Sequence, residues 1–121
     1  MRGLCAATII WVAGCVSIDG GAVELRWAIR DNAGVSLRCG EAGIETVTLV
    51  AEDEDGQLSA FPFDCEEEHG TTNFELHQGR YLFRVDPAGP GAVGVAVPNP
   101  IVAGVRDGEV TDLQVLVLRT P

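Results

Sequence analysis

Six side chains in this sequence carry the groups most able to do chemistry: four thiols and two imidazoles. They belong to Cys5, Cys15, Cys39, Cys65, His69 and His77. A thiol can be alkylated, pair in a disulfide or ligate a metal, and an imidazole can ligate a metal or act as a general base. Which of these happens depends on the compartment and on the elements that hold each residue.

The first two cysteines lie within or directly after an apolar N-terminal run. Met1 and Arg2 give a positive start, and Leu4–Gly14 is an uncharged run of eleven residues. This is far shorter than the roughly 20 residues of a membrane-spanning helix, but it has the length of the apolar core of a secretory signal. The run therefore predicts export. A buried N-terminal strand or helix is the alternative, although the run shows neither alternation nor a helical period.

The end of the run is more specific. "VAGC", Val12–Cys15, resembles the bacterial lipoprotein box, in which the chain is cut before the cysteine and the thiol takes up a diacylglycerol. The resemblance implies a signal peptide over residues 1–14, a lipidated Cys15 with a short tether over residues 15–20, and a domain over residues 21–121. Membrane lipid is then a partner through the acyl chains on Cys15. Val16, where aspartate would retain a lipoprotein at the inner membrane, indicates the cell envelope and the outer membrane of a Gram-negative bacterium. Ordinary secretory cleavage, with Cys15 left as a thiol, is the alternative.

This resemblance leaves Cys39 and Cys65 as the two remaining cysteines. An oxidising compartment favours a disulfide between them. It would close a loop of about 26 residues, for which the chain-entropy model gives roughly 3–4 kcal/mol. Two free buried thiols and a metal site are the alternatives.

Composition excludes several classes of function. The net charge is −10, and the 8 basic residues are all arginines that form no cluster. The sequence therefore offers no basic surface for binding nucleic acid or anionic lipid. No nucleophile elbow, phosphate-binding loop or dinucleotide fingerprint is present, and only two histidines could serve as a base. The sequence therefore predicts a protein that is not an enzyme and needs no cofactor.

Two acidic segments are weak candidates for a metal site. Asp53 and Asp55 lie in "EDEDG" at an expected hairpin turn, but the spacing does not fit an EF-hand, so only a loose calcium site is conceivable. Glu68, His69 and His77 could together hold zinc, although their spacing matches no ligand motif. A solvated turn and an exposed acidic loop are the favoured interpretations, and no metal site is predicted.

The rest of the chain alternates apolar and polar residues with period two, which is typical of β-strands. We expect strands within residues 22–30, 44–52, 58–65, 72–77, 79–87, 92–98 and 110–120. About seven short strands separated by Gly-, Pro- and Asp-rich breaks predict an all-β fold, a single antiparallel β-sandwich.

Single residues add detail to this fold. Pro62 marks an edge or bulged strand. Trp27 is expected in the core near the disulfide, and every aromatic ring after Cys15 is expected to face inward. The last strand, apolar on both faces, is expected to be covered on both.

A second resemblance covers most of the domain. "LHQGRYLFRV" is similar to a strand start of the carboxypeptidase-regulatory, Cna-B and transthyretin-like sandwiches, with Leu76, Gly79, Tyr81 and Val85 at the shared positions. Val105–Val117 resembles the last hairpin of these domains. The resemblance implies a prealbumin- or immunoglobulin-like sandwich and no particular activity. Without lysine, the internal lysine–asparagine bond of some Cna-B domains cannot form.

Three functions follow in order of preference. The first is a membrane-anchored envelope lipoprotein whose sandwich is a structural or protein-interaction module, with the strand expected around Ala92–Val97 offering an edge to an envelope protein. The second is a metal- or ligand-binding surface module that uses the acidic loops. The third, a hydrolase that uses His69 or His77, has no supporting motif.

Overall fold

The computed structural model describes residues 19–121 of the chain. The predicted signal peptide, the lipidation of Cys15 and most of the tether lie outside the described residues, so they stay predictions. Within residues 19–121, no helix is long and apolar enough to cross a membrane.

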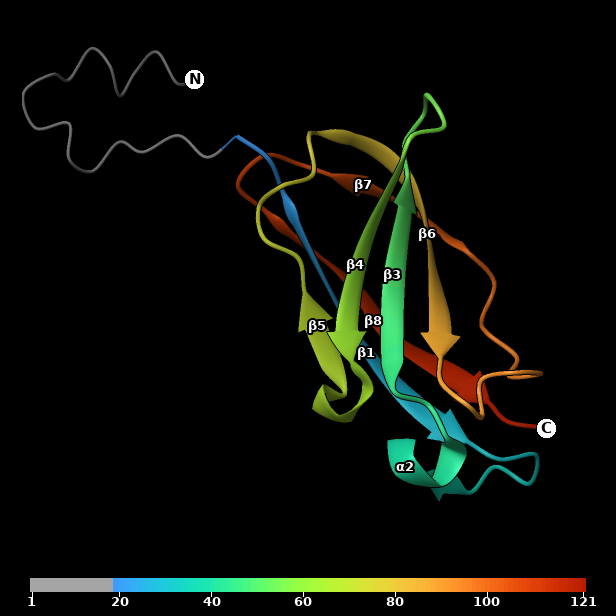
Figure 1. Cartoon of the computed structure of the whole chain (residues 1–121). Coiled ribbons are helices and arrows are strands. Elements are labelled where there is room, and N and C mark those ends of the chain that lie inside the picture. Colours follow the sequence, from blue (N-terminus) through green and yellow to red (C-terminus); the bar gives the residue numbers. More distant parts are fainter. Residues whose placement is uncertain (1–18) are drawn as a thin grey trace, which may run out of the picture.

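The first sheet is built around the first and last strands of the domain (Figure 1). Its strands are β1 (Ala22–Arg30), β2 (Ser36–Leu37), β5 (His69–Thr71) and β8 (Val110–Arg119). β8 pairs with β1 in parallel along nearly its whole length, while β2 and β5 pair antiparallel with opposite ends of the other edge of β1. The parallel pair differs from the wholly antiparallel sandwich that we expected. It is possible because the entire domain serves as the long crossover that parallel neighbours require.

The second sheet is wholly antiparallel, in the order β4-β3-β6-β7. Its strands are β3 (Thr46–Glu52), β4 (Leu58–Asp64), β6 (Gly79–Ala88) and β7 (Ile101–Val105). β4 is an edge strand, as the presence of Pro62 predicted. Two short helices, α2 (Cys39–Ala42) and η2 (Cys65–Glu67), connect the sheets at one end.

The two sheets pack face to face over a single core, which confirms the predicted all-β sandwich. The alternation of β1 places Leu25, Trp27 and Ile29 in this core, opposite Leu49 of β3 and Phe83 of β6. Trp27 is 4% exposed, as expected for a core residue. Each strand therefore has one buried face, and its other face is free for other roles.

Several expected elements differ from the structure. Residues 72–77 form a turn in which only Leu76 makes a bridge, and residues 92–97 form turns in which only Ala96 makes one. Ala92–Val97 is therefore not the open edge strand that we expected. The edge of the second sheet opposite β4 is instead β7, a strand that the Pro- and Gly-rich surroundings of residues 101–105 concealed.

The resemblance to a final hairpin is also wrong. β7 pairs with β6, whereas β8 pairs with β1, so the turn between them crosses from one sheet to the other. β8 is covered on one face only, since Val115 is 48% exposed. A bulge with Gln114 at φ 71° shifts the alternation, so that Leu113 and Leu116 both face the core.

The sandwich has two distinct ends (Figure 1). At the tether end, Asp107 accepts a hydrogen bond from the Gly20 N–H at 2.9 Å, and Gly21 forms a bridge with Leu76, next to the His77 that contacts Asp53. At the disulfide end lie α2, η2 and the C-terminus. One end therefore contains a disulfide, and the other contains turns with acidic residues.

Candidate functional site

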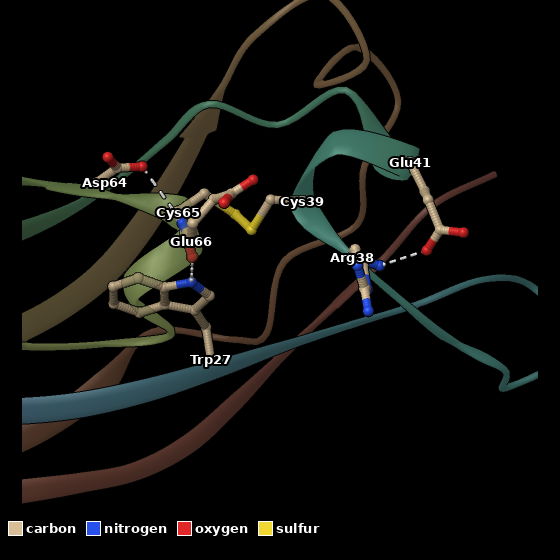
Figure 2. The surroundings of a disulfide bond; sticks show 7 residues. All are labelled: Trp27, Arg38, Cys39, Glu41, Asp64, Cys65 and Glu66. Carbon is tan, nitrogen blue, oxygen red and sulfur yellow. Dashed lines mark hydrogen bonds between the residues drawn. A yellow bond between two sulfur atoms is a disulfide. The ribbon is translucent and has the colours of Figure 1, made fainter.

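The disulfide end is held by the predicted Cys39–Cys65 bond (Figure 2). The bond joins α2 to η2 with a Cα–Cα distance of 6.0 Å, and Cys65 is fully buried. The indole Nε1 of Trp27 donates a hydrogen bond of 2.9 Å to the Cys65 carbonyl oxygen, so Trp27 does lie beside the disulfide. This cluster is therefore a structural clasp between the two sheets.

Packing around the indole ring leaves little freedom. The ring centroids of Trp27 and Phe63 are 6.0 Å apart, and a Cβ added at Gly70 would lie 2.7 Å from the Phe63 ring. Gly70 is therefore needed for the close approach of β5 to Phe63.

Two shallow hollows flank the clasp, with volumes of about 150 and 320 Å³. Cys39 and Glu68 line both; Trp27 and Leu37 line the smaller hollow, and Arg38 and Glu66 line the larger. The larger hollow has charged groups of both signs, whereas Glu68 is the only charged residue that lines the smaller hollow. Glu68, a weak metal candidate, has a left-handed backbone (φ 63°) because it caps η2.

The weak metal candidates are only partly brought together. Asp53 and His77 meet at the tether end, where Oδ2 and Nε2 are 3.9 Å apart, while His69 lies in β5 with its Nδ1 2.8 Å from the Glu67 carbonyl oxygen. The other Asp53 oxygen, Oδ1, accepts the backbone N–H groups of Asp55 and Gln57 at 2.9 and 2.8 Å. Asp53 thus shapes the β3–β4 turn. In the described part of the chain, no three His, Cys, Asp or Glu side chains are grouped to hold a metal ion.

Tyr81 completes the packing at the tether end. Its ring is 4% exposed, and its hydroxyl donates a hydrogen bond of 2.7 Å to the His77 carbonyl oxygen. Burial raises the pKa of the Tyr81 phenol, and the nearby Asp53 carboxylate raises it further. Both effects favour the neutral, hydrogen-bonded phenol.

The most distinctive surface is a row of aliphatic side chains on the outer face of the second sheet. Glu52 of β3 pairs with Leu58 of β4 and with Leu82 of β6, and Leu82 pairs in turn with Val102 of β7. Leu58, Leu82 and Val102 are 60%, 37% and 58% exposed. We call these three residues the aliphatic row; it crosses all four strands and is interrupted only by Glu52. Large exposed apolar groups aligned in this way mark interaction surfaces more often than isolated ones do.

A hollow of about 210 Å³ opens on the aliphatic row near the tether end. Its apolar floor is formed by Leu82 and Val102, and the remaining lining comes from Glu52, Asp53, Glu54, Arg80 and Tyr81. The hollow is smaller than the roughly 300–1,000 Å³ of pockets that enclose a drug-sized ligand. It is therefore suited to a single long side chain.

Sequence reasoning missed the aliphatic row. Leu82 lies between Tyr81 and Phe83, both buried, and Val102 belongs to a strand that the pattern did not reveal. One signal was present: in "RYLFRV" an apolar residue occupies the outward phase of an otherwise clear alternation. The prediction that all aromatic rings face inward is wrong for Phe74, which is 40% exposed in the β5–β6 connection because no strand forms there.

Comparisons with known proteins add the fold and little more. No family model matches the chain, and no curated protein matches it. One solved structure is similar, a protein from Bacteroides thetaiotaomicron described as a "putative polysaccharide binding" protein (DUF1812), with a TM-score of 0.53 and 11% identity. The match covers 81% of this chain but only 46% of that one, so the chain spans less than half the length of its structural neighbour. At this identity the two share a fold.

Proposed function

We propose that this chain is a non-enzymatic binding module of the cell envelope, anchored through lipid on Cys15, which holds a protein partner on the aliphatic row. The observation that carries the proposal is the alignment of Leu58, Leu82 and Val102 across the outer face of the second sheet, where each remains exposed in the folded domain. Burying such side chains against a partner removes apolar surface from water, which is favourable by about 25 cal/mol per Å² before the costs of association.

The chemistry of the exposed groups favours a protein over a saccharide. Stacking on a sugar ring uses exposed aromatic faces, and within residues 19–121 only Phe74 exposes as much as 40% of its surface. It lies in the β5–β6 connection and is not part of the row. A polysaccharide, the ligand class suggested by the description of the structural neighbour, is therefore the second candidate.

The absence of a catalytic arrangement supports a binding role. Within residues 19–121, His69 contacts a backbone carbonyl oxygen and His77 contacts Asp53, and neither histidine hydrogen bonds to a serine, threonine or cysteine side chain. Neither histidine is therefore paired with a nucleophile in the way that covalent catalysis requires.

Site-specific photocrosslinking in intact cells tests the binding surface. A photoreactive residue at Val102 should yield one discrete protein adduct, whereas the same residue at Val115, similarly exposed on the outer face of the other sheet, should yield none. Adducts of equal yield from both positions, or a saccharide adduct from Val102, would contradict the proposal.

The anchor is tested separately. Metabolic labelling with a palmitate analogue should mark the wild-type chain, and Cys15→Ser should abolish the label. Retention of label in Cys15→Ser would refute lipidation at this residue.

A further inference from the structure

The hollow on the aliphatic row has a charged rim. Glu52, Asp53 and Glu54 contribute three carboxylates and Arg80 one guanidinium, so the lining has a formal charge of −2, from −3 and +1. Asp53 is engaged in its turn and faces His77. Among residues 19–121, the carboxylates of Glu52 and Glu54 make no hydrogen bond or ion pair. Two carboxylates beside an exposed aliphatic floor thus lack partners.

The charge of the whole chain also favours a positively charged partner. Its net charge of −10, with no lysine, produces a field that draws positively charged partners toward the surface. A cation held by oxygen ligands alone is a poor fit, because one Asp53 oxygen is already used and the floor is apolar.

Lysine and arginine side chains match both parts of the hollow. They carry a long aliphatic stem that lies along apolar surface and a charged head that stays at the polar rim. We infer that the hollow receives a lysine or arginine side chain from a basic protein segment, with the stem on Leu82 and Val102 and the charge at Glu52 and Glu54. This inference rests on the proposed function, and it names the class of partner that the aliphatic row selects.

Binding of a defined peptide tests the inference. The probe is a fluorescent synthetic peptide in which lysine alternates with valine, and fluorescence anisotropy is measured with the full-length protein in a non-ionic detergent. Glu52→Gln combined with Glu54→Gln should weaken binding about tenfold, which corresponds to about 1.4 kcal/mol. Glu24→Gln combined with Glu109→Gln removes the same charge from exposed positions outside the hollow and should change the affinity less than about twofold. A peptide with glutamate in place of lysine should not bind.

Two results would overturn the inference. Equal weakening by both pairs of substitutions would mean that net charge alone attracts the peptide. Failure of the lysine peptide to bind, together with a discrete protein adduct at Val102, would mean that the row binds a protein of another chemistry, so the proposed function would survive. If the photoreactive residue at Val102 yields no protein adduct, both the proposed function and this inference are refuted.

Discussion

The disulfide end and the tether end of the sandwich are built differently. At the disulfide end, the Cys39–Cys65 bond and the indole of Trp27 clasp the sheets, and Cys65 is fully buried. At the tether end no disulfide links the described residues. The turns are held there by hydrogen bonds such as those of Asp53, Asp107 and Tyr81.

This difference is consistent with the proposed function, in which one end stabilises the fold and the other end binds a partner. The clasp fixes the sheets to each other at one end, so the other end can expose carboxylates and an aliphatic row without losing the fold. If Cys15 carries lipid, the five residues to Gly20 reach at most about 17 Å, which brings the tether end close to the bilayer. The disulfide end lies about 30 Å from the tether end, the length of the nine-residue strand β1 that runs between them.

The largest expected effect comes from breaking the clasp. Cys39→Ala with Cys65→Ala should lower the free energy of unfolding by about 3–4 kcal/mol, because the unfolded chain regains the freedom of a loop of 26 residues. Urea unfolding followed by far-ultraviolet circular dichroism measures the loss, and the same signal serves variants without Trp27. Anisotropy with the lysine peptide on the folded variant should be unchanged, since the hollow lies at the other end. A loss below about 1 kcal/mol would contradict the assigned role of the clasp.

The next effect concerns the indole bond within the clasp. Trp27→Phe removes one of the two donors to the buried Cys65 carbonyl oxygen, which keeps the Glu68 N–H at 3.1 Å, and it leaves a smaller ring in the core, so the free energy of unfolding should fall by about 1–2 kcal/mol. A double-mutant cycle with the cysteine pair should show coupling, because both changes remove an interaction of Cys65. Strict additivity would mean that the hydrogen bond and the disulfide stabilise the domain independently.

A smaller effect, with a distinct pH dependence, is expected at the tether end. Tyr81→Phe removes the hydrogen bond to the His77 carbonyl and should cost about 0.5–1.5 kcal/mol at neutral pH. The pKa of Tyr81 is raised in the folded state, so its contribution is complete below the unfolded value of about 10 and is lost as the pH rises through the folded pKa. Because the chain has one tyrosine and no lysine, Tyr81→Phe should remove most of the alkaline fall in stability that begins above the unfolded value of about 10. An identical alkaline fall in the variant would assign it to another group.

The two ends also differ in how well the sequence predicted them. The disulfide was predictable because the lipoprotein-box resemblance left only Cys39 and Cys65, and the burial of Trp27 followed from the regular alternation of β1. The aliphatic row was not predictable in this way, since it depends on the register among four strands and on β7, whose five residues carry no alternating charge. Likewise, Asp53 and His77 meet only because the β3–β4 turn and the β5–β6 connection lie at the same end, which no local pattern encodes.

The smallest expected effect on stability separates recognition from folding most sharply. Val102→Thr keeps a β-branched side chain on β7 and replaces one exposed methyl group by a hydroxyl, so the free energy of unfolding should change by less than about 0.5 kcal/mol. Val115→Thr on β8 makes the same change at 48% exposure and should be equally mild. Yet only Val102→Thr should weaken capture of the partner by a photoreactive residue at Leu58, because only Val102 belongs to the aliphatic row. If Val102→Thr and Val115→Thr differ in stability but capture the partner equally well, the outer face of the second sheet stabilises the fold and does not bind a partner.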